Sequence, residues 1–168
     1  AQAIQAQAEA NVFEHRQTPP LFGLGLINGI DATEIEAHAD PNDLNGDGIS
    51  GRVSYVDGNR VGRFGWKAQV PSIEEFVRDA VATELGMTLD AQSGLTFGKI
   101  QDSDDVADPE MDLAEAAQLA NFLRLLGPPP RQSAADGANV GRGEEVFSEV
   151  GCNLCHVPVL SGASGPVE

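Results

Sequence analysis

The chain has 168 residues, of which 41% are hydrophobic and 5% are aromatic, so its length suits one domain with a modest core. Its 26 acidic and 10 basic residues give a formal charge of −16, which excludes electrostatic binding to nucleic acid or to an anionic membrane surface. The sequence contains no run of 18 apolar residues, so we expect no membrane span.

The first part of the chain combines short helical segments with loops. Residues 1–10 are good helix formers and predict a helix. Residues 15–30 contain prolines and glycines, which favour a bent, buried segment over a regular element. Asp31 is a candidate N-cap for a short helix whose Ile35 and Ala39 face inward, and residues 40–70 predict loop.

A clearer helix is expected after residue 72. Ser72 and Glu75 have the spacing of a capping box, and Gly86 stands where a C-terminal glycine belongs. Apolar residues recur between these ends at helical spacing and predict the buried face: Ile73, Phe76, Val77, Ala80, Val81 and Leu85.

Two further helices complete the prediction. Asp108, followed by proline, is the predicted N-cap of a helix that ends before Gly127, with a buried stripe at Leu113, Ala116, Ala117, Ala120, Leu123 and Leu126. A last helix is expected at about 138–150. We find no strand pair, so the sequence predicts an all-α fold of cytochrome c-like helices with long irregular loops.

Both cysteines lie in one motif, GCNLCH at 151–156. C-x-x-C-H is the attachment motif of a c-type haem, in which two thiols add to the vinyl groups and the histidine ligates the iron. We therefore expect Cys152 and Cys155 to hold haem c and His156 to bind its iron. A redox dithiol and a zinc site are the alternatives, but the first lacks a βαβ setting and the second lacks a nearby fourth ligand.

Four stretches in order carry a family resemblance: RQTPPLFGLGLI at 16–27, HADPNDLNGDGISGR at 38–52, GRFGWKA at 62–68, and the GCNLCH block. They resemble the di-haem cytochromes named as thiol oxidoreductases, which are related to bacterial di-haem cytochrome c peroxidases and to di-haem enzymes that modify tryptophan. The resemblance covers about residues 13–160 and implies a periplasmic protein with two cytochrome c-like haem domains.

The resemblance also implies how the chain is divided. Residues 1–132 correspond to the region between two haems, and 133–168 to the start of the second haem domain. Because 12 residues follow His156, we expect an incomplete haem domain, with the first C-x-x-C-H before Ala1 and the second distal ligand after Glu168.

The implied function is that of a peroxidase-like oxidoreductase in which this haem receives electrons from a protein partner and feeds a catalytic haem. Catalysis by this chain alone is not expected, and its catalytic residues are not identified. The alternatives are a mono-haem electron carrier without catalysis and a haem-free protein that uses its thiols for redox chemistry or metal binding.

Residues 43–48 match the first half of a calcium loop, with oxygen ligands at alternate positions followed by glycine: Asp43, Asn45 and Asp47. Ile49 can add its backbone carbonyl. The twelfth position is Ser54 rather than Glu, so the loop is no EF-hand, and Asp40 or Asp57 would have to complete the shell. The alternative is a solvated turn.

Trp66 is the only tryptophan of the chain. The related peroxidases suggest an electron-transfer residue between two haems, whereas the interpretation that we favour is an aromatic side chain that anchors its loop to the core. Four nearby bases can pair with haem propionates or simply balance neighbouring acids: Arg52, Arg60, Arg63 and Lys67.

The remaining candidates are ligands and a docking face. A sixth haem ligand from within the chain would be His15, His38, Met87 or Met111, although the resemblance favours a ligand further downstream. The segment from Asp102 to Glu115 has seven acids and no base. It suits docking of a basic electron-transfer partner, or is a solvated loop before a helix.

Overall fold

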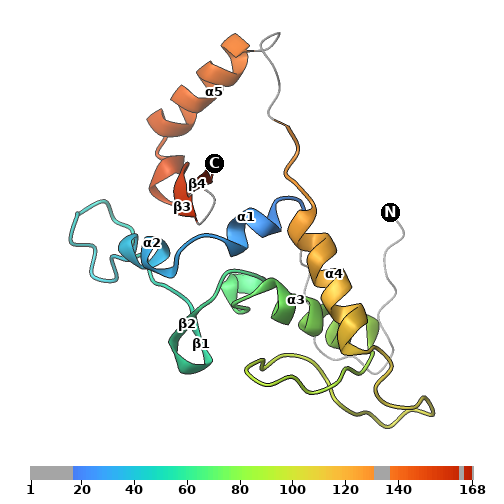
Figure 1. The fold of residues 1–168 in the computed structure, drawn as a ribbon. Helices are drawn as coiled ribbons and strands as arrows, with labels where there is room; N and C mark the ends of the chain where they lie inside the picture. The colour runs from blue at the N-terminus through green and yellow to red at the C-terminus, as the bar shows by residue number, and fades with distance from the viewer. Residues whose placement is uncertain (1–16, 131–136, 163–164, 168) are drawn as a thin grey trace, which may run out of the picture.

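The computed structural model describes residues 17–130, 137–162 and 165–167. Within these ranges it has five α-helices and two small antiparallel sheets, so the prediction of an all-α fold is wrong (Figure 1). No helix among the described residues is long and apolar enough to cross a bilayer. The helix expected at 1–10 and the domain boundary at 132/133 lie outside the described residues.

The hydrophobic core lies where three helices meet: α1 (Leu24–Asn28), α3 (Ile73–Ala80) and α4 (Leu113–Leu125) (Figure 1). Helix α1 was not predicted, because its glycines weaken the helical pattern. One of them, Gly25, lets α1 approach α4 so closely that a Cβ there would clash with the carbonyl oxygen of Arg124. Across the same region, Arg124 forms an ion pair with Glu74 of α3.

Helix α3 begins as predicted, with the N–H of Glu75 donating to the Ser72 hydroxyl at 3.2 Å. It continues as a π-helical turn, η3 (Val81–Leu85), and ends at Gly86, whose φ is 75°. Val81 is buried as predicted, but Leu85 is 64% exposed. The prediction for Leu85 is wrong because it assumed α-helical spacing, whereas Leu85 lies within a π turn, which is wider and places its side chains at other angles around the helix axis.

Helix α4 starts at Leu113, four residues later than predicted from an N-cap at Asp108. Its N-terminus has a capping box between Asp112 and Glu115. The preceding residues cannot be helical because they pair with residues 88–89. The N–H of Met111 donates to the Thr88 carbonyl at 3.1 Å, and the Glu110 carboxylate accepts the Thr88 N–H at 2.9 Å.

The first sheet pairs β1 (Tyr55–Val56) with β2 (Arg60–Val61) across the turn η1 (Asp57–Asn59). Gly58 and Asn59 both have a φ of 67°, the left-handed geometry of a tight hairpin turn. The second sheet pairs β3 (Leu160–Gly162) with β4 (Gly165–Val167). With two or three residues each, these strands are too short to show the alternation by which a strand is predicted.

Helix α5 (Gly137–Glu149) confirms the prediction for 138–150, and the turn η4 (Cys152–Leu154) follows it. In Figure 1, α5 stands apart from the helical core, and the β3–β4 hairpin lies beside α2 (Ala32–Ala37). In the α2 region, Ile35 is half-buried, but Ala39 is exposed instead of facing inward because the helix has ended before it.

Candidate functional site

The C-x-x-C-H motif forms one tight turn directly after α5. Gly151 has a φ of 81°, and this left-handed residue separates α5 from η4. The Cys152 carbonyl oxygen accepts the N–H of Cys155 at 3.2 Å and that of His156 at 2.9 Å. These bonds hold the backbone of the motif in one turn, and the ligand atoms of Cys152, Cys155 and His156 do not all lie within 4.8 Å of one another. Both cysteines are free, with Cys152 half-buried and Cys155 exposed.

The surroundings of the turn are apolar and open. The Phe147 ring meets the His156 ring edge-on, with 6.2 Å between centroids and an interplanar angle of 63°. Apolar side chains on both sides of the motif are between 38% and 68% exposed: Val146, Phe147, Val150, Leu154, Val157 and Val159. Two thiols, an imidazole and an apolar surround fit the requirements of a covalently attached haem.

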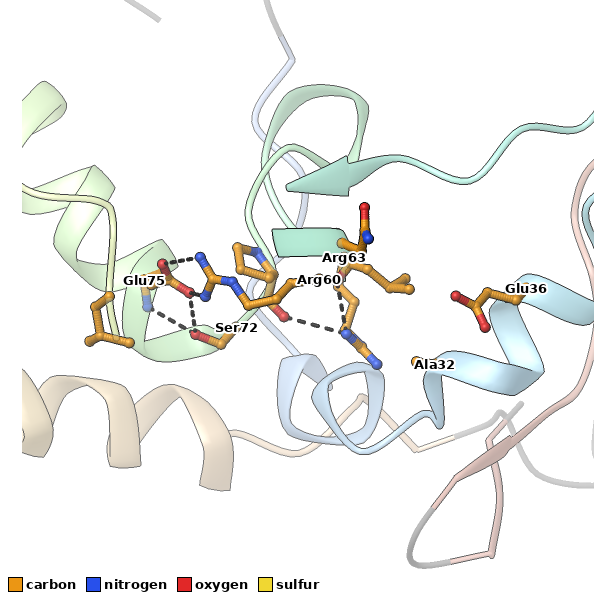
Figure 2. Close-up of a pocket in the computed structure, with 10 residues that line it drawn as sticks. Ala32, Glu36, Arg60, Arg63, Ser72 and Glu75 are labelled. Carbon is orange, nitrogen blue, oxygen red and sulfur yellow. Dashed lines mark hydrogen bonds and ion pairs between the residues drawn. The ribbon is translucent and has the colours of Figure 1, made fainter. Parts of the chain in front are cut away.

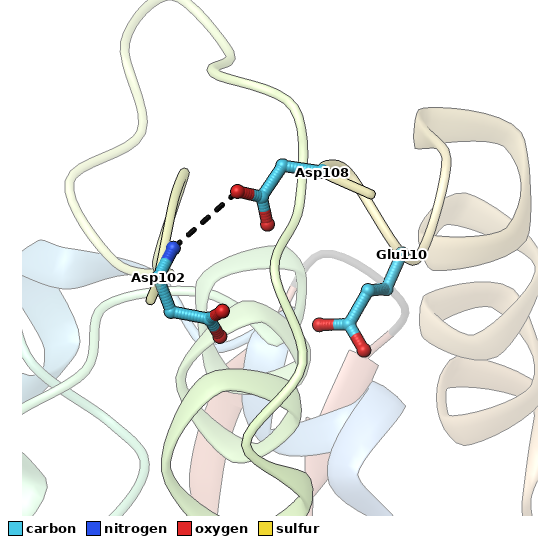
Figure 3. A group of neighbouring side chains, drawn as sticks. All are labelled: Asp102, Asp108 and Glu110. Atoms are coloured by element: carbon cyan, nitrogen blue, oxygen red, sulfur yellow. Dashed lines mark hydrogen bonds between the residues drawn. The ribbon is translucent and has the colours of Figure 1, made fainter. Parts of the chain in front are cut away.

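The structure does not favour zinc at the cysteines. Among the described residues, one group of at least three His, Cys, Asp or Glu side chains has its ligand atoms within 4.8 Å of one another, and it consists of Asp102, Asp108 and Glu110 (Figure 3). Neither cysteine belongs to it, so in the described part of the chain no three such ligand atoms are gathered around them.

These three carboxylates already have partners in the protein. The Asp102 carboxylate pairs with Lys99 at 3.2 Å, Asp108 accepts the N–H of Asp102 at 3.4 Å, and Glu110 binds residue 88 as described above. The N–H of Asp104 and, more weakly, Lys99 lower the pKa of Asp102 against an opposing effect of burial. The sequence showed an acidic run here, but the spacing 102–108–110 matches no metal motif and gave no signal for the grouping.

The predicted calcium loop is shaped by its own backbone. Asp43 accepts the N–H of Gly48 with both oxygens at 3.1 Å, and the Asn45 side-chain oxygen accepts the N–H of Asp47 at 3.0 Å. Asp47 in turn accepts the N–H of Ile49 at 2.8 Å. These bonds form the loop, and calcium at Asp43, Asn45, Asp47 and Ile49 stays a prediction.

The two further candidates for this calcium shell lie differently. The Asp40 carboxylate accepts hydrogen bonds from the N–H groups of Leu44 and Asn45, and these bonds lower the pKa of Asp40. Asp57 belongs to the β1–β2 turn, where its carboxylate accepts the Thr96 hydroxyl at 2.7 Å. Of the two, only Asp40 is therefore hydrogen-bonded to the predicted loop.

Trp66 lies at the start of η2 (Trp66–Ala68), in a loop closed by mutual backbone hydrogen bonds between Phe64 and Val70 of 2.8 and 3.0 Å. Lys67 and Ala68 have φ values of 56° and 52°, so two consecutive residues with side chains adopt a strained left-handed backbone. Trp66 is 47% exposed, whereas Phe64 is 4% exposed and anchors this loop to the core. A role for Trp66 in electron transfer stays a prediction.

Two of the predicted propionate partners line a pocket of 450 Å³ between α2, β2 and the start of α3 (Figure 2). Arg60 binds the fully buried Glu75 through two hydrogen bonds of 2.5 and 3.1 Å, which raise the pKa of Arg60. Arg63 donates to the carbonyls of Val61 and Ile30 at 2.9 and 2.8 Å. Both guanidinium groups are therefore engaged with protein groups.

The described candidates for a sixth haem ligand have contacts of their own within the protein. Met87 and Met111 pack, partly buried, against the helical core. His38 is exposed, and its Nδ1 lies 2.8 Å from the Glu34 carbonyl oxygen. His15 lies outside the described residues.

Comparison with known proteins identifies the family. Residues 5–168 match a family model described as "di-haem oxidoreductase, putative peroxidase". No curated protein and no solved structure matched the chain. The match includes all four stretches of the sequence resemblance and extends over nearly the whole length, so the chain belongs to the di-haem oxidoreductase family.

Proposed function

We propose that this chain binds haem c covalently through Cys152 and Cys155, with His156 as an iron ligand, for electron transfer in a periplasmic, peroxidase-like di-haem oxidoreductase. The observation that carries the proposal is the single turn that presents two free thiols and an exposed imidazole beside α5. Family membership supports haem as the group bound. When bound, the haem supplies one-electron redox chemistry at its iron.

The protein contributes attachment, orientation and exclusion of water. The thiols attach the macrocycle at two points, and the backbone hydrogen bond from the His156 N–H to the Cys152 carbonyl holds His156 in the same turn as Cys152. The edge-to-face contact between the Phe147 and His156 rings favours one orientation of the imidazole. Val150 and Leu154, which are 68% and 51% exposed, supply apolar surface that a macrocycle can cover.

An electron-transfer protein is the proposed partner. The charge of −16, with seven acids and no base between Asp102 and Glu115, favours a basic one. Exposed acids on this segment, such as Asp104 and Asp105, are accessible for docking.

The decisive experiment is expression with a c-type haem maturation system, followed by a pyridine haemochrome spectrum and haem staining after denaturation. The wild-type chain is expected to retain haem, and a Cys152→Ser/Cys155→Ser double variant is expected to lose it. His156→Ala should change the absorption spectrum, whereas His38→Ala, the same substitution at another exposed histidine, should not.

A wild-type chain whose matured form holds no haem after denaturation, with two titratable thiols, would contradict the proposal in favour of a haem-free dithiol protein. Covalent haem in the double serine variant would contradict the assignment of the two attachment residues.

A further inference from the structure

The haem-attachment segment touches the rest of the protein through the β3–β4 hairpin. The N–H of Ser161 in β3 donates to the carboxylate of Glu34 in α2 at 3.1 Å, across 127 residues of chain. Next to it, Gly162 and Ile30 form an isolated antiparallel bridge. The hairpin is therefore docked on the segment 30–34 by one backbone pair and one charge-assisted hydrogen bond.

This contact controls where the haem motif lies, because the connecting chain is short. Strand β3 begins four residues after His156. Four residues span at most about 14 Å when fully extended. A hairpin that stays on α2 therefore keeps the Cys152–His156 turn close to α2, and a hairpin that leaves α2 releases it.

The other side of the contact is firmly held. Ile30 is 6% exposed, and its carbonyl oxygen accepts the Arg63 guanidinium at 2.8 Å. Arg63 lies in the chain between β2 and the loop that carries Trp66, and the backbone N–H of Arg63 donates to the Val70 carbonyl at 2.9 Å. A continuous set of bonds thus runs from the Trp66 loop through Arg63 and Ile30 to the hairpin.

We propose that Glu34 is a positioning residue that holds the haem-attachment turn at a fixed distance from the Trp66 loop, with Arg63 and Ile30 as the supporting side of the contact. Because electron-transfer rates fall steeply with distance, this contact sets how readily the bound haem exchanges electrons with groups on the core side. The inference rests on the proposed haem attachment, but the contact itself does not require haem.

The contact is tested first in the haem-free chain, by hydrogen exchange of the Ser161 amide. Glu34→Ala is expected to speed this exchange at least tenfold, because it removes the acceptor. Glu34→Gln keeps a carbonyl oxygen at the site and is expected to stay within threefold of wild type. Glu36→Ala is the matched control, because Glu36 lies on the same helix but accepts the Tyr55 hydroxyl instead.

The position of the haem is tested by fluorescence of Trp66, the only tryptophan. Haem quenches tryptophan by distance-dependent energy transfer. Relative to each variant's haem-free form, Glu34→Ala should at least double the residual fluorescence of the haem-loaded protein, and Glu34→Gln and Glu36→Ala should leave it unchanged.

Unchanged Ser161 exchange in Glu34→Ala, or faster exchange with undiminished quenching, would overturn the inference. The amide of Ala116 in the core should exchange at the wild-type rate in every variant, and its acceleration in Glu34→Ala would show general loosening and also count against a positioning role. A chain that takes up no haem contradicts the proposed function, while the exchange experiment still decides whether Glu34 holds the hairpin.

Discussion

Glu75 is the residue on which the buried polar part of this fold depends. Its side chain is fully buried, and besides Arg60 it accepts the N–H of Thr96 at 2.9 Å. A buried carboxylate is costly unless charge and hydrogen-bond partners surround it. Glu75 has both, and so it joins α3 to β2 and to the loop around Thr96.

Removal of this carboxylate is expected to destabilise the protein strongly. Glu75→Ala removes the carboxylate that neutralises the Arg60 guanidinium and accepts the Thr96 N–H, and should lower the free energy of unfolding by about 3 kcal/mol. Glu75→Gln keeps an acceptor for Thr96 and should cost less. Urea unfolding followed by circular dichroism measures both.

The control is Glu84→Ala, which removes an exposed carboxylate from η3 and should change stability by no more than about 0.5 kcal/mol. If Glu75→Ala were as stable as Glu84→Ala, the buried network would not hold these elements together.

At the scale of elements, the start of α4 is decided by contacts with a distant segment and not by the local sequence signal. The Asp–Pro pair at 108–109 is a good helix start by local rules, yet the capping box forms at Asp112, where the Asp112 carboxylate accepts the Glu115 N–H at 2.8 Å. Pairing of residues 110–111 with 88–89 competes with an earlier start and wins.

The two aspartates therefore differ in their expected effect. Asp112→Ala removes the cap and should lower the free energy of unfolding by about 1 kcal/mol. Asp108→Ala removes only a long 3.4 Å bond to the N–H of Asp102 and should cost less than about 0.5 kcal/mol. Thermal or urea unfolding of both variants measures the difference, and a larger loss in Asp108→Ala would place the cap where the sequence alone put it.

Periodicity predicted α3 and α4 because each is long enough to repeat its apolar pattern, and capping located the start of α3 but not that of α4. The expected helix at 138–150 was also found, as α5. The β1–β2 hairpin was missed although Asp57–Gly58 is a turn signal, since two-residue strands add no pattern of their own. Burial of Glu75 and Arg78 was missed because charged residues on a helix are expected to face water.

At the site, too, features set by local sequence could be predicted, and contacts between distant segments could not. The C-x-x-C-H motif is contiguous in the sequence, so its single turn follows from local spacing, while its role as a haem site stays a prediction. The bond between Glu34 and Ser161 joins segments far apart in the chain, and nothing in either segment specifies the other. Contacts of this kind depend on how the whole chain packs and not on any local pattern.

At the scale of the whole molecule, charge is the dominant feature. The net charge of −16 gives the protein a negative field, and the exposed acids between Asp102 and Glu115 concentrate it on one loop region. A field of this kind accelerates encounter with a basic partner and loses its effect as salt screens it. The proposed partner interaction therefore has a measurable dependence on ionic strength.

Stopped-flow absorption can follow electron exchange between the haem-loaded protein and a small basic cytochrome c. The rate should fall about tenfold or more when the salt concentration rises from about 0.01 M to about 0.1 M, because the Debye length falls from about 30 Å to about 10 Å. Asp105→Asn should slow the low-salt rate by about two- to threefold and should have no effect at about 1 M salt. Asp31→Asn removes the same charge from an exposed position at the start of α2, where the side chain makes no cap hydrogen bond, and should change the rate less. Equal slowing by both variants would mean that net charge alone attracts the partner, and the acidic segment would then have no special part in docking.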